Sequence, residues 1–305
     1  MTVSTVAVSG RSRAGSSVPA RRRPPWGRRA RKGASRVAFY ALLGVFVVVS
    51  LFPFYWIVVT SLKTNAEISR GTTSLLPSHV TWANYVTDFT KEDFLRPLLN
   101  SVIVASSTTA ITVVVASLAG YALARTAMRG KTMFQGFFLV AGFFPVIAMV
   151  GPLFIVYRDL NLLNNLAGLA FAYLIYSIPL ATWFLANFFS QIPRELEEAA
   201  TVDGASRLRA LRSVIAPIAV PGIFTIAILS FIFCWNDYLI AVSFVTNPGT
   251  FTAPLAIIGL GESQYQTFYN LIDAAVVIVT LPIALIVIVA QRRIISGLTA
   301  GAVKS

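Results

Sequence analysis

The chain has 305 residues, of which 56% are hydrophobic and only 12% are charged. A soluble domain carries about 25% charged residues, so this composition excludes an ordinary soluble protein and favours one embedded in lipid. The formal net charge of +13 would suggest nucleic-acid binding if the chain were soluble. The single cysteine, Cys234, excludes an intrachain disulfide, and the single histidine, His79, has no neighbouring residues that would complete a metal site.

Six stretches are apolar enough for membrane-spanning helices, each near the ~20 residues that the bilayer core requires. Long apolar runs of this kind are typical of helices. The expected fold is therefore an all-α membrane protein with six transmembrane helices. In chain order they cover about residues 37–59, 98–123, 133–156, 166–189, 218–245 and 271–289.

The N-terminal arm, residues 1–36, is rich in Arg, Ser, Gly and Pro, and we expect it to be disordered because it cannot bury a core. The first span and an outer segment follow over residues 37–97, then a five-helix core over 98–291 and a tail over 292–305. A cleaved signal peptide is the alternative for the first apolar run. Such a peptide has an apolar region of only about 7–15 residues and a small-residue cleavage site, so an uncleaved span is favoured.

The basic residues gather on one side of the predicted bundle. Of the 25 Lys and Arg residues, 20 lie in the arm, in the loops after spans two and four, and in the tail. Cytoplasmic loops carry this excess, so both termini are expected in the cytoplasm of a multi-pass protein of the bacterial plasma membrane, in contact with lipid. The orientation of the protein in the membrane accounts for the basic residues of the arm, so no nucleic acid is expected as a partner.

The Arg-rich loop from Gln191 to Pro217 has the pattern of two short helices joined by a turn. Pro193 and the glutamates after it favour a helix start, and Gly204 is expected to end that helix in a left-handed conformation. Asp203 or Ser206 would cap a second helix that stops at Pro217. Its apolar residues are spaced by three and four, as in an amphipathic helix at the membrane face: Leu208, Leu211 and Ile215.

This loop resembles the EAA loop of ABC importer permeases. The likeness rests on the sequence EAATVDGA from Glu198 to Ala205, with Ile215 and Pro217 behind it; Leu211 replaces the family's usual aromatic residue. The resemblance implies a type I ABC importer permease fold, whose loop docks into a cleft of an ABC ATPase dimer and couples nucleotide state to permease state. It assigns this coupling to Glu198, Ala199, Ala200, Asp203, Gly204 and Ala205. An exposed amphipathic loop without such a partner is the alternative.

Three other segments resemble maltose-type carbohydrate permeases: the tail from Gln291 to Lys304, Trp235-Asn236-Asp237-Tyr238 in span five, and Ser61-Leu62-Lys63. The likeness covers about residues 37–304 and implies a sugar importer, working with a second homologous permease chain and an extracytoplasmic substrate-binding protein. A non-sugar solute such as a glycerol phosphate stays open. The resemblance also implies that the tail contacts the ATPase, and a frayed terminus is the alternative. The residues taken for this contact are Gly297, Thr299 and Gly301.

Polar and aromatic residues within the predicted spans are candidates for a substrate pathway, because such groups are costly in lipid. Carboxylate, amide and aromatic side chains can bind sugar hydroxyls and cover apolar sugar faces. The alternative is a structural role in helix packing or in an aromatic belt. The candidates are Trp235, Asn236, Asp237, Tyr238, Tyr173 and Tyr176.

A nucleotide site is not expected on this chain. The nearest match to a phosphate-binding loop, Arg125 to Thr132, lacks the first glycine and joins two predicted membrane helices. We therefore expect no bound cofactor, no enzymatic activity here, and ATP hydrolysis by a partner subunit. A stand-alone secondary transporter would place ionisable residues or broken helices at mid-membrane, and a membrane enzyme would need a catalytic constellation, so both are weaker alternatives.

Overall fold

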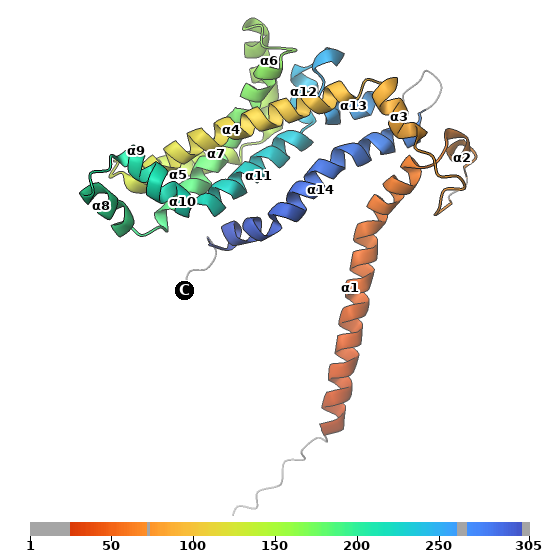
Figure 1. Ribbon diagram of the computed structural model, residues 1–305, viewed down its shortest axis with the longest axis horizontal. Coiled ribbons are helices and arrows are strands. Elements are labelled where there is room, and N and C mark those ends of the chain that lie inside the picture. The colour runs from red at the N-terminus through yellow and green to blue at the C-terminus, as the bar shows by residue number, and fades with distance from the viewer. Residues whose placement is uncertain (1–24, 72–73, 261–266, 301–305) are drawn as a thin grey trace, which may run out of the picture. The chain divides into compact units, whose positions relative to one another are not determined.

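The computed structural model describes residues 25–71, 74–260 and 267–300, and its regular structure there is helical. The chain divides into two compact units, residues 1–53 and residues 54–305. Figure 1 shows the helices, which in chain order are α1 (Pro25–Ser61), α2 (Asn65–Ser69), α3 (Ala83–Thr90), α4 (Leu95–Arg125), α5 (Lys131–Gly142), α6 (Val146–Asp159), α7 (Leu166–Ser190), α8 (Glu195–Val202), α9 (Arg207–Ala210), the π-helix η1 (Leu211–Ile215), α10 (Ala216–Ile218), α11 (Val220–Asn236), α12 (Leu239–Phe244), the 3-10 helix η2 (Pro248–Thr250), α13 (Ala253–Gly259) and α14 (Tyr269–Ala300).

Four helical stretches are long and apolar enough to cross a membrane, and they confirm the first, second, fourth and sixth predicted spans. They are Arg36–Ser61, Leu95–Arg125, Leu166–Ser190 and Tyr269–Gln291. Two bent pairs bring the number to six if each pair forms one span. These are Lys131–Gly142 with Val146–Asp159, and Arg207–Ile218 with Val220–Asn236.

The first helix begins earlier than the sequence indicates. α1 starts at Pro25, whereas the predicted span starts near residue 37. Proline lacks an N–H and suits the first helical turn, because an N–H there would have no partner within the helix; the Arg, Ala and Lys residues that follow are good helix formers. Residues 25–36 of the predicted arm therefore continue the helix, and residues 1–24 lie outside the described ranges.

The third predicted span, residues 133–156, is broken rather than continuous. α5 ends at Gly142, α6 begins at Val146, and their axes are bent by 89°. Pro145 stands directly before α6. A proline disfavours a helical conformation in the residue before it and clashes with the preceding turn, so α5 cannot run through it.

The fifth predicted span, residues 218–245, is interrupted at both ends. The helix that includes α10 meets α11 at a bend of 81°. Pro221 lies in the first turn of α11, a position that suits a new helix start. α11 then ends at Asn236, because Asp237 adopts an extended backbone with ψ of 133°. The continuous helix is therefore Val220–Asn236, shorter than the predicted span.

α4, α7 and α11 form the centre of the second unit, with α5 packed on α7 and α14 packed on α11. A Cβ atom added to Gly120 of α4 would lie 3.0 Å from the backbone nitrogen of Ala186 on α7, so the two helices approach closely. The Thr108 hydroxyl donates to the Ala170 carbonyl across the same interface at 3.4 Å. In Figure 1, α8 and α9 lie at one end of these central helices, and α12 and α13 lie toward the other.

Candidate functional site

The loop after α7 folds as the sequence predicts in its first half. α8 begins at Glu195, two residues after Pro193, and carries Glu195, Glu197 and Glu198 in its first turn. Carboxylates at this position are stabilised by the positive end of the helix dipole. The predicted start of the first helix is thus confirmed.

The turn between α8 and α9 is built around Gly204, whose φ is +83°. The Ala205 N–H donates to the Ala200 carbonyl at 2.9 Å, and the Gly204 N–H donates to the Thr201 carbonyl at 3.0 Å. These two bonds and the left-handed glycine form a Schellman motif, which satisfies the last carbonyls of α8. Of the two predicted caps, Ser206 caps α9 by accepting from the Arg209 N–H at 3.4 Å. Asp203 instead ends α8.

The second half of the loop departs from the prediction. The helix does not stop at Pro217 but runs through it to Ile218, after a π-helical turn in which the Ala216 N–H donates to the Leu211 carbonyl. The wider turn is a local adjustment just before a residue that cannot donate a helical hydrogen bond. Leu211 and Ile215 are buried, whereas Leu208 is 66% exposed, so the predicted apolar face is divided between the bundle and the surface.

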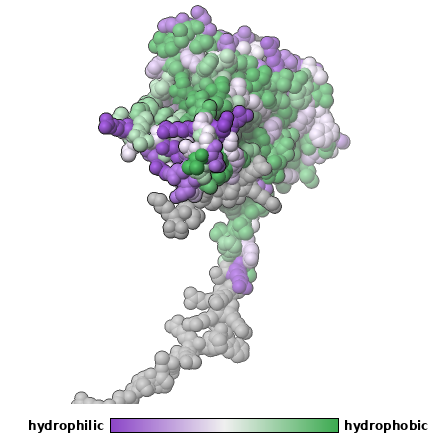
Figure 2. Space-filling model, turned by 60° about the vertical axis from the view of Figure 1, so that its left-hand side comes forward, coloured by the Kyte–Doolittle hydropathy of each residue, from purple (hydrophilic) through white to green (hydrophobic). Residues whose placement is uncertain are grey.

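The predicted coupling residues share one accessible surface around this turn. Glu198, Ala199, Asp203 and Gly204 are exposed, and Ala200 and Ala205 are half-buried. Two apolar side chains stand out beside them, Val202 at 88% exposure and Leu208 at 66%. Exposed arginines border the same surface: Arg194, Arg207, Arg209 and Arg212. Figure 2, which turns this end of the molecule forward, shows hydrophilic residues gathered at its tip and apolar surface around it.

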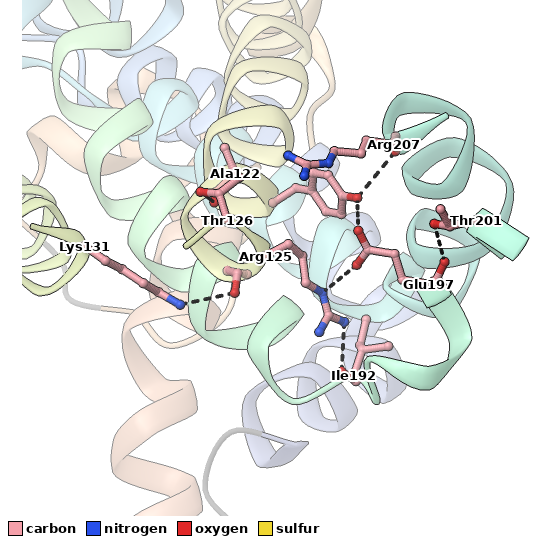
Figure 3. A network of polar contacts seen from close by, with 10 residues as sticks. Ala122, Arg125, Thr126, Lys131, Ile192, Glu197, Thr201 and Arg207 are labelled. Atoms are coloured by element: carbon pink, nitrogen blue, oxygen red, sulfur yellow. Dashed lines mark hydrogen bonds and ion pairs between the residues drawn. The ribbon is translucent and has the colours of Figure 1, made fainter. Parts of the chain in front are cut away.

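α8 is tied to the end of α4 by a polar network that the sequence reasoning missed. Arg125 Nε lies 3.2 Å from Glu197 Oε2, and Arg125 Nη2 donates to the Ile192 carbonyl at 2.8 Å. The Tyr121 hydroxyl donates to Glu197 Oε1 and also lies 3.4 Å from the Arg207 carbonyl. Figure 3 shows Arg125 and Glu197 facing each other between the two helices. A possible signal was the spacing of Tyr121 and Arg125, one helical turn apart at the end of a predicted span.

The resemblance of Arg125 to Thr132 to a phosphate-binding loop has a structural explanation. This segment joins α4 to α5, and Gly130 precedes α5 with φ of +81°. The Lys131 ammonium donates to the Ala124 carbonyl at 3.1 Å and so covers the end of α4. Two of its basic residues, Arg125 and Lys131, thus make local contacts at the end of α4.

Two predicted pathway residues come together. The Tyr173 hydroxyl of α7 donates to Asp237 Oδ2 at 2.9 Å. The same oxygen accepts the N–H groups of Ile240 at 3.0 Å and Ala241 at 3.1 Å, so Asp237 caps the start of α12. This geometry agrees with the structural alternative for Asp237, and nothing in it tests contact with a substrate.

The other pathway candidates lie apart. Trp235 is 1% exposed and donates from Nε1 to the Val279 carbonyl of α14 at 3.1 Å, which joins α11 to α14. Asn236 and Tyr238 are exposed. Tyr176 lines a cavity of ≈ 280 Å³ between α5, α6, α7 and α11, together with Ser177, Trp183, Phe233 and other side chains. Of the tail residues, Gly297 and Thr299 lie on the helical backbone of α14, and Gly301 lies outside the described residues.

The chain can now be compared with known proteins. Residues 113–299 match the family described as binding-protein-dependent transport system inner membrane component. The trehalose transport system permease protein SugB of Mycobacterium tuberculosis is 42% identical over 274 residues, 89% of this chain and 99% of that protein. The sulfoquinovosyl glycerol transport system permease protein SmoH of Agrobacterium fabrum is 38% identical over 260 residues, 85% of this chain and 91% of that protein. A chain from the crystal structure of a bacterial ABC transporter involved in alginate import superposes with a TM-score of 0.71 at 25% identity, over 85% of this chain and 96% of that one. The chain therefore belongs to the family of binding-protein-dependent inner membrane components and is a multi-pass ABC importer permease.

Proposed function

We propose that this chain is the transmembrane permease subunit of an ATP-driven sugar importer. The observation that carries the proposal is the exposed α8–Gly204–α9 surface at one end of the bundle, held to α4 by side-chain contacts. The relatives belong to transport systems for trehalose and a sulfoquinovosyl glycerol, and the structural neighbour takes part in the import of alginate. These solutes share sugar rings, so we infer a mono- or oligosaccharide as substrate.

The proposed assembly contains an ABC ATPase dimer, a second homologous permease chain and an extracytoplasmic substrate-binding protein. This chain would bind no cofactor and catalyse no reaction, since ATP would be hydrolysed by the partner subunits. The Arg-rich loops support a cytoplasmic position for the α8–α9 surface and both termini, on the side where ATP is available. The tail residues Gly297, Thr299 and Gly301 would add a second contact with the ATPase.

The proposed mechanism is alternating access. ATP binding closes the ATPase dimer and moves the surface formed by Glu198, Ala199, Ala200, Asp203, Gly204 and Ala205. Small side chains at the turn allow a partner groove to approach the backbone, and Glu198 supplies one anionic contact. The movement shifts the central helices between outward-open and inward-open arrangements, and the sugar enters from the binding protein in the first and leaves in the second.

A substrate pathway would run along the central helices. Tyr176 and Trp183 present aromatic surface to the cavity between α5, α6, α7 and α11, and Ser177 lines it with a hydroxyl. Aromatic faces suit apolar sugar faces, and hydroxyls suit sugar hydroxyls. Asn236 and Tyr238 are accessible for such contacts, whereas Tyr173 and Asp237 would act by fixing the start of α12.

The test uses the complete transporter reconstituted in proteoliposomes with its ATPase, second permease and binding protein. Glu198→Lys reverses the exposed charge, and Gly204→Pro imposes a φ near −65° where the turn needs +83°. Both variants are expected to abolish uptake of radiolabelled trehalose or maltose while the protein remains in the membrane.

The matched control is Asp159→Lys, which reverses an exposed charge at the end of α6, far along the chain from the coupling surface. It should leave uptake unchanged. Wild-type uptake by both Glu198→Lys and Gly204→Pro would exclude the coupling role. Uptake by this chain without any ATPase would replace the proposal with a secondary transporter.

A further inference from the structure

The two adjacent glutamates of α8 point to different surroundings. Glu198 is exposed at the proposed partner surface, whereas the Glu197 side chain is only 17% exposed and pairs with Arg125. The Arg125 side chain is 5% exposed. An exposed pair in the same chain, Arg158 and Asp159, has 61% exposure on both sides. The Arg125–Glu197 pair is thus shielded from water, where ion pairs are stronger and more costly to break.

The polar contacts between α8 and α4 converge on Glu197. None of the residues of α8 is buried, and its backbone packs on α9 and η1. The polar contacts from α4 come from two side chains one turn apart, and both reach Glu197: Tyr121 through its hydroxyl and Arg125 through Nε. Arg125 also holds the chain before α8 through the Ile192 carbonyl.

α4 is anchored at its other end as well. The Asn100 amide donates to the carbonyls of Gly249 and Phe251, and the Ser101 hydroxyl accepts the Ala253 N–H. The helix has 31 residues, which corresponds to a length of ~46 Å at 1.5 Å per residue. A displacement of α8 that is passed to α4 would therefore reach the η2–α13 region.

We propose that Arg125 and Tyr121 are positioning residues that transmit the movement of α8 to α4, with Glu197 as their counterpart. The inference rests on the proposed function, because it assumes that an ATPase moves α8. Glu198 meets the partner, and Glu197 passes the motion inward. Without the pair, α8 follows the ATPase while α4 stays behind, so ATP is hydrolysed without sugar import.

The experiment measures ATP hydrolysis and trehalose or maltose uptake on the same proteoliposomes of the complete transporter. Glu197→Gln and Arg125→Gln are each expected to raise the ATP consumed per sugar imported about tenfold, a typical size for coupling between sites. The double variant should raise the ATP consumed per sugar no further than the more severe single variant does, because both substitutions remove the same interaction. Tyr121→Phe, which removes only the hydroxyl, should give a smaller increase in the ATP consumed per sugar. It tests the inference if the charge variants fold poorly.

Arg158→Gln and Asp159→Asn remove the exposed ion pair and serve as matched controls, with an unchanged ratio. A merely stabilising pair would lower the amount of complex or its thermal midpoint but would leave ATP per sugar unchanged, and that result overturns the inference. Additive effects of the two charge variants also overturn it. If the wild-type complex binds its ATPase but imports no sugar, the proposed function itself is refuted. That outcome differs from a failure of the inference, in which the wild type imports sugar and the variants keep its ratio of ATP to sugar.

Discussion

The two ends of α4 are held by different chemistry. At the α8 end, the contacts are a charged pair between Arg125 and Glu197 and a tyrosine hydroxyl. At the opposite end, neutral groups bind backbone: the Asn100 amide reaches the Gly249 and Phe251 carbonyls at 3.2 and 2.9 Å. Neutral hydrogen bonds weaken steeply when their geometry changes, whereas charge attraction falls only with distance. The end that is proposed to move is therefore held by an attraction that persists while the helices change orientation, so it can carry a displacement of α8 to α4.

Gly120→Val gives the largest expected effect, because it disrupts the packing of α4 on α7, on which both ends of α4 depend. The new Cβ would lie 3.0 Å from the Ala186 nitrogen and the Leu185 Cβ on α7, and the backbone there cannot yield. We expect destabilisation of about 3 kcal/mol or more by overpacking, with loss of a monodisperse complex in size-exclusion chromatography. Gly136→Val on α5 is the control, since nothing lies within 4 Å of its added Cβ. A Gly120→Val complex with a wild-type profile would show that α4 and α7 are not rigidly packed.

Asn100→Ala tests the neutral end. It removes two hydrogen bonds to the partly buried carbonyls of Gly249 and Phe251, at a cost of about 1–2 kcal/mol. The thermal midpoint in detergent should fall equally at low and high salt, because the groups involved are neutral and salt does not screen them. Asn236→Ala is the control, because that exposed amide bonds only within its own helix. A salt-dependent loss for Asn100→Ala would remove the distinction between the two ends.

Local rules predicted the α8–Gly204–α9 turn well. The glutamates after Pro193, the left-handed Gly204 and the Ser206 cap each depend on residues within about five positions, which a single sequence displays. The apolar runs likewise predicted four spans directly, because hydropathy over ~20 residues reflects the solvent rather than a specific partner.

Long-range contacts were beyond the same reasoning. Tyr121 meets Glu197 across 76 residues, and Tyr173 meets Asp237 across 64 residues. Asp237 was expected inside a continuous span, but the helix ends before it, and its carboxylate also accepts the Tyr173 hydroxyl from α7. The break before α6 was visible in principle at Pro145, whose effect on the preceding turn outweighs the apolar run around it.

Asp88 is expected to make the N-terminal end of α4 sensitive to pH. It lies on α3, its carbonyl accepts the Phe94 N–H just before α4, and burial, with a smaller contribution from the Glu92 charge, raises its pKa from 3.8 to about 7. The folded state thus binds a proton that the unfolded state releases, so this contribution to stability is present at low pH and is lost as pH rises through about 7. The thermal midpoint should fall by a few degrees between about pH 6 and pH 8.

Asp88→Asn should flatten this pH profile, because the amide cannot ionise, and Asp159→Asn at an exposed position should leave it intact. Differential scanning fluorimetry of the purified complex measures both. A profile that stays the same in Asp88→Asn would assign the pH dependence to another group. Loosening near the N-terminal end of α4 at high pH would also show that this end, despite its neutral bonds, is not uniformly rigid.

Gly204→Ala gives the smallest expected effect and is confined to the α8 end. Nothing lies within 4 Å of the added Cβ, so the cost is the left-handed backbone alone, about 1 kcal/mol for alanine and less for asparagine. The Ala205 amide, bonded to the Ala200 carbonyl, should exchange its hydrogen faster, whereas amides near Asn100 should not change. Equal changes at both sites would mean that the turn and the N-terminal end of α4 open as one unit. Because the strain is confined to the backbone of the turn, the prediction is that the exchange difference stops at α8.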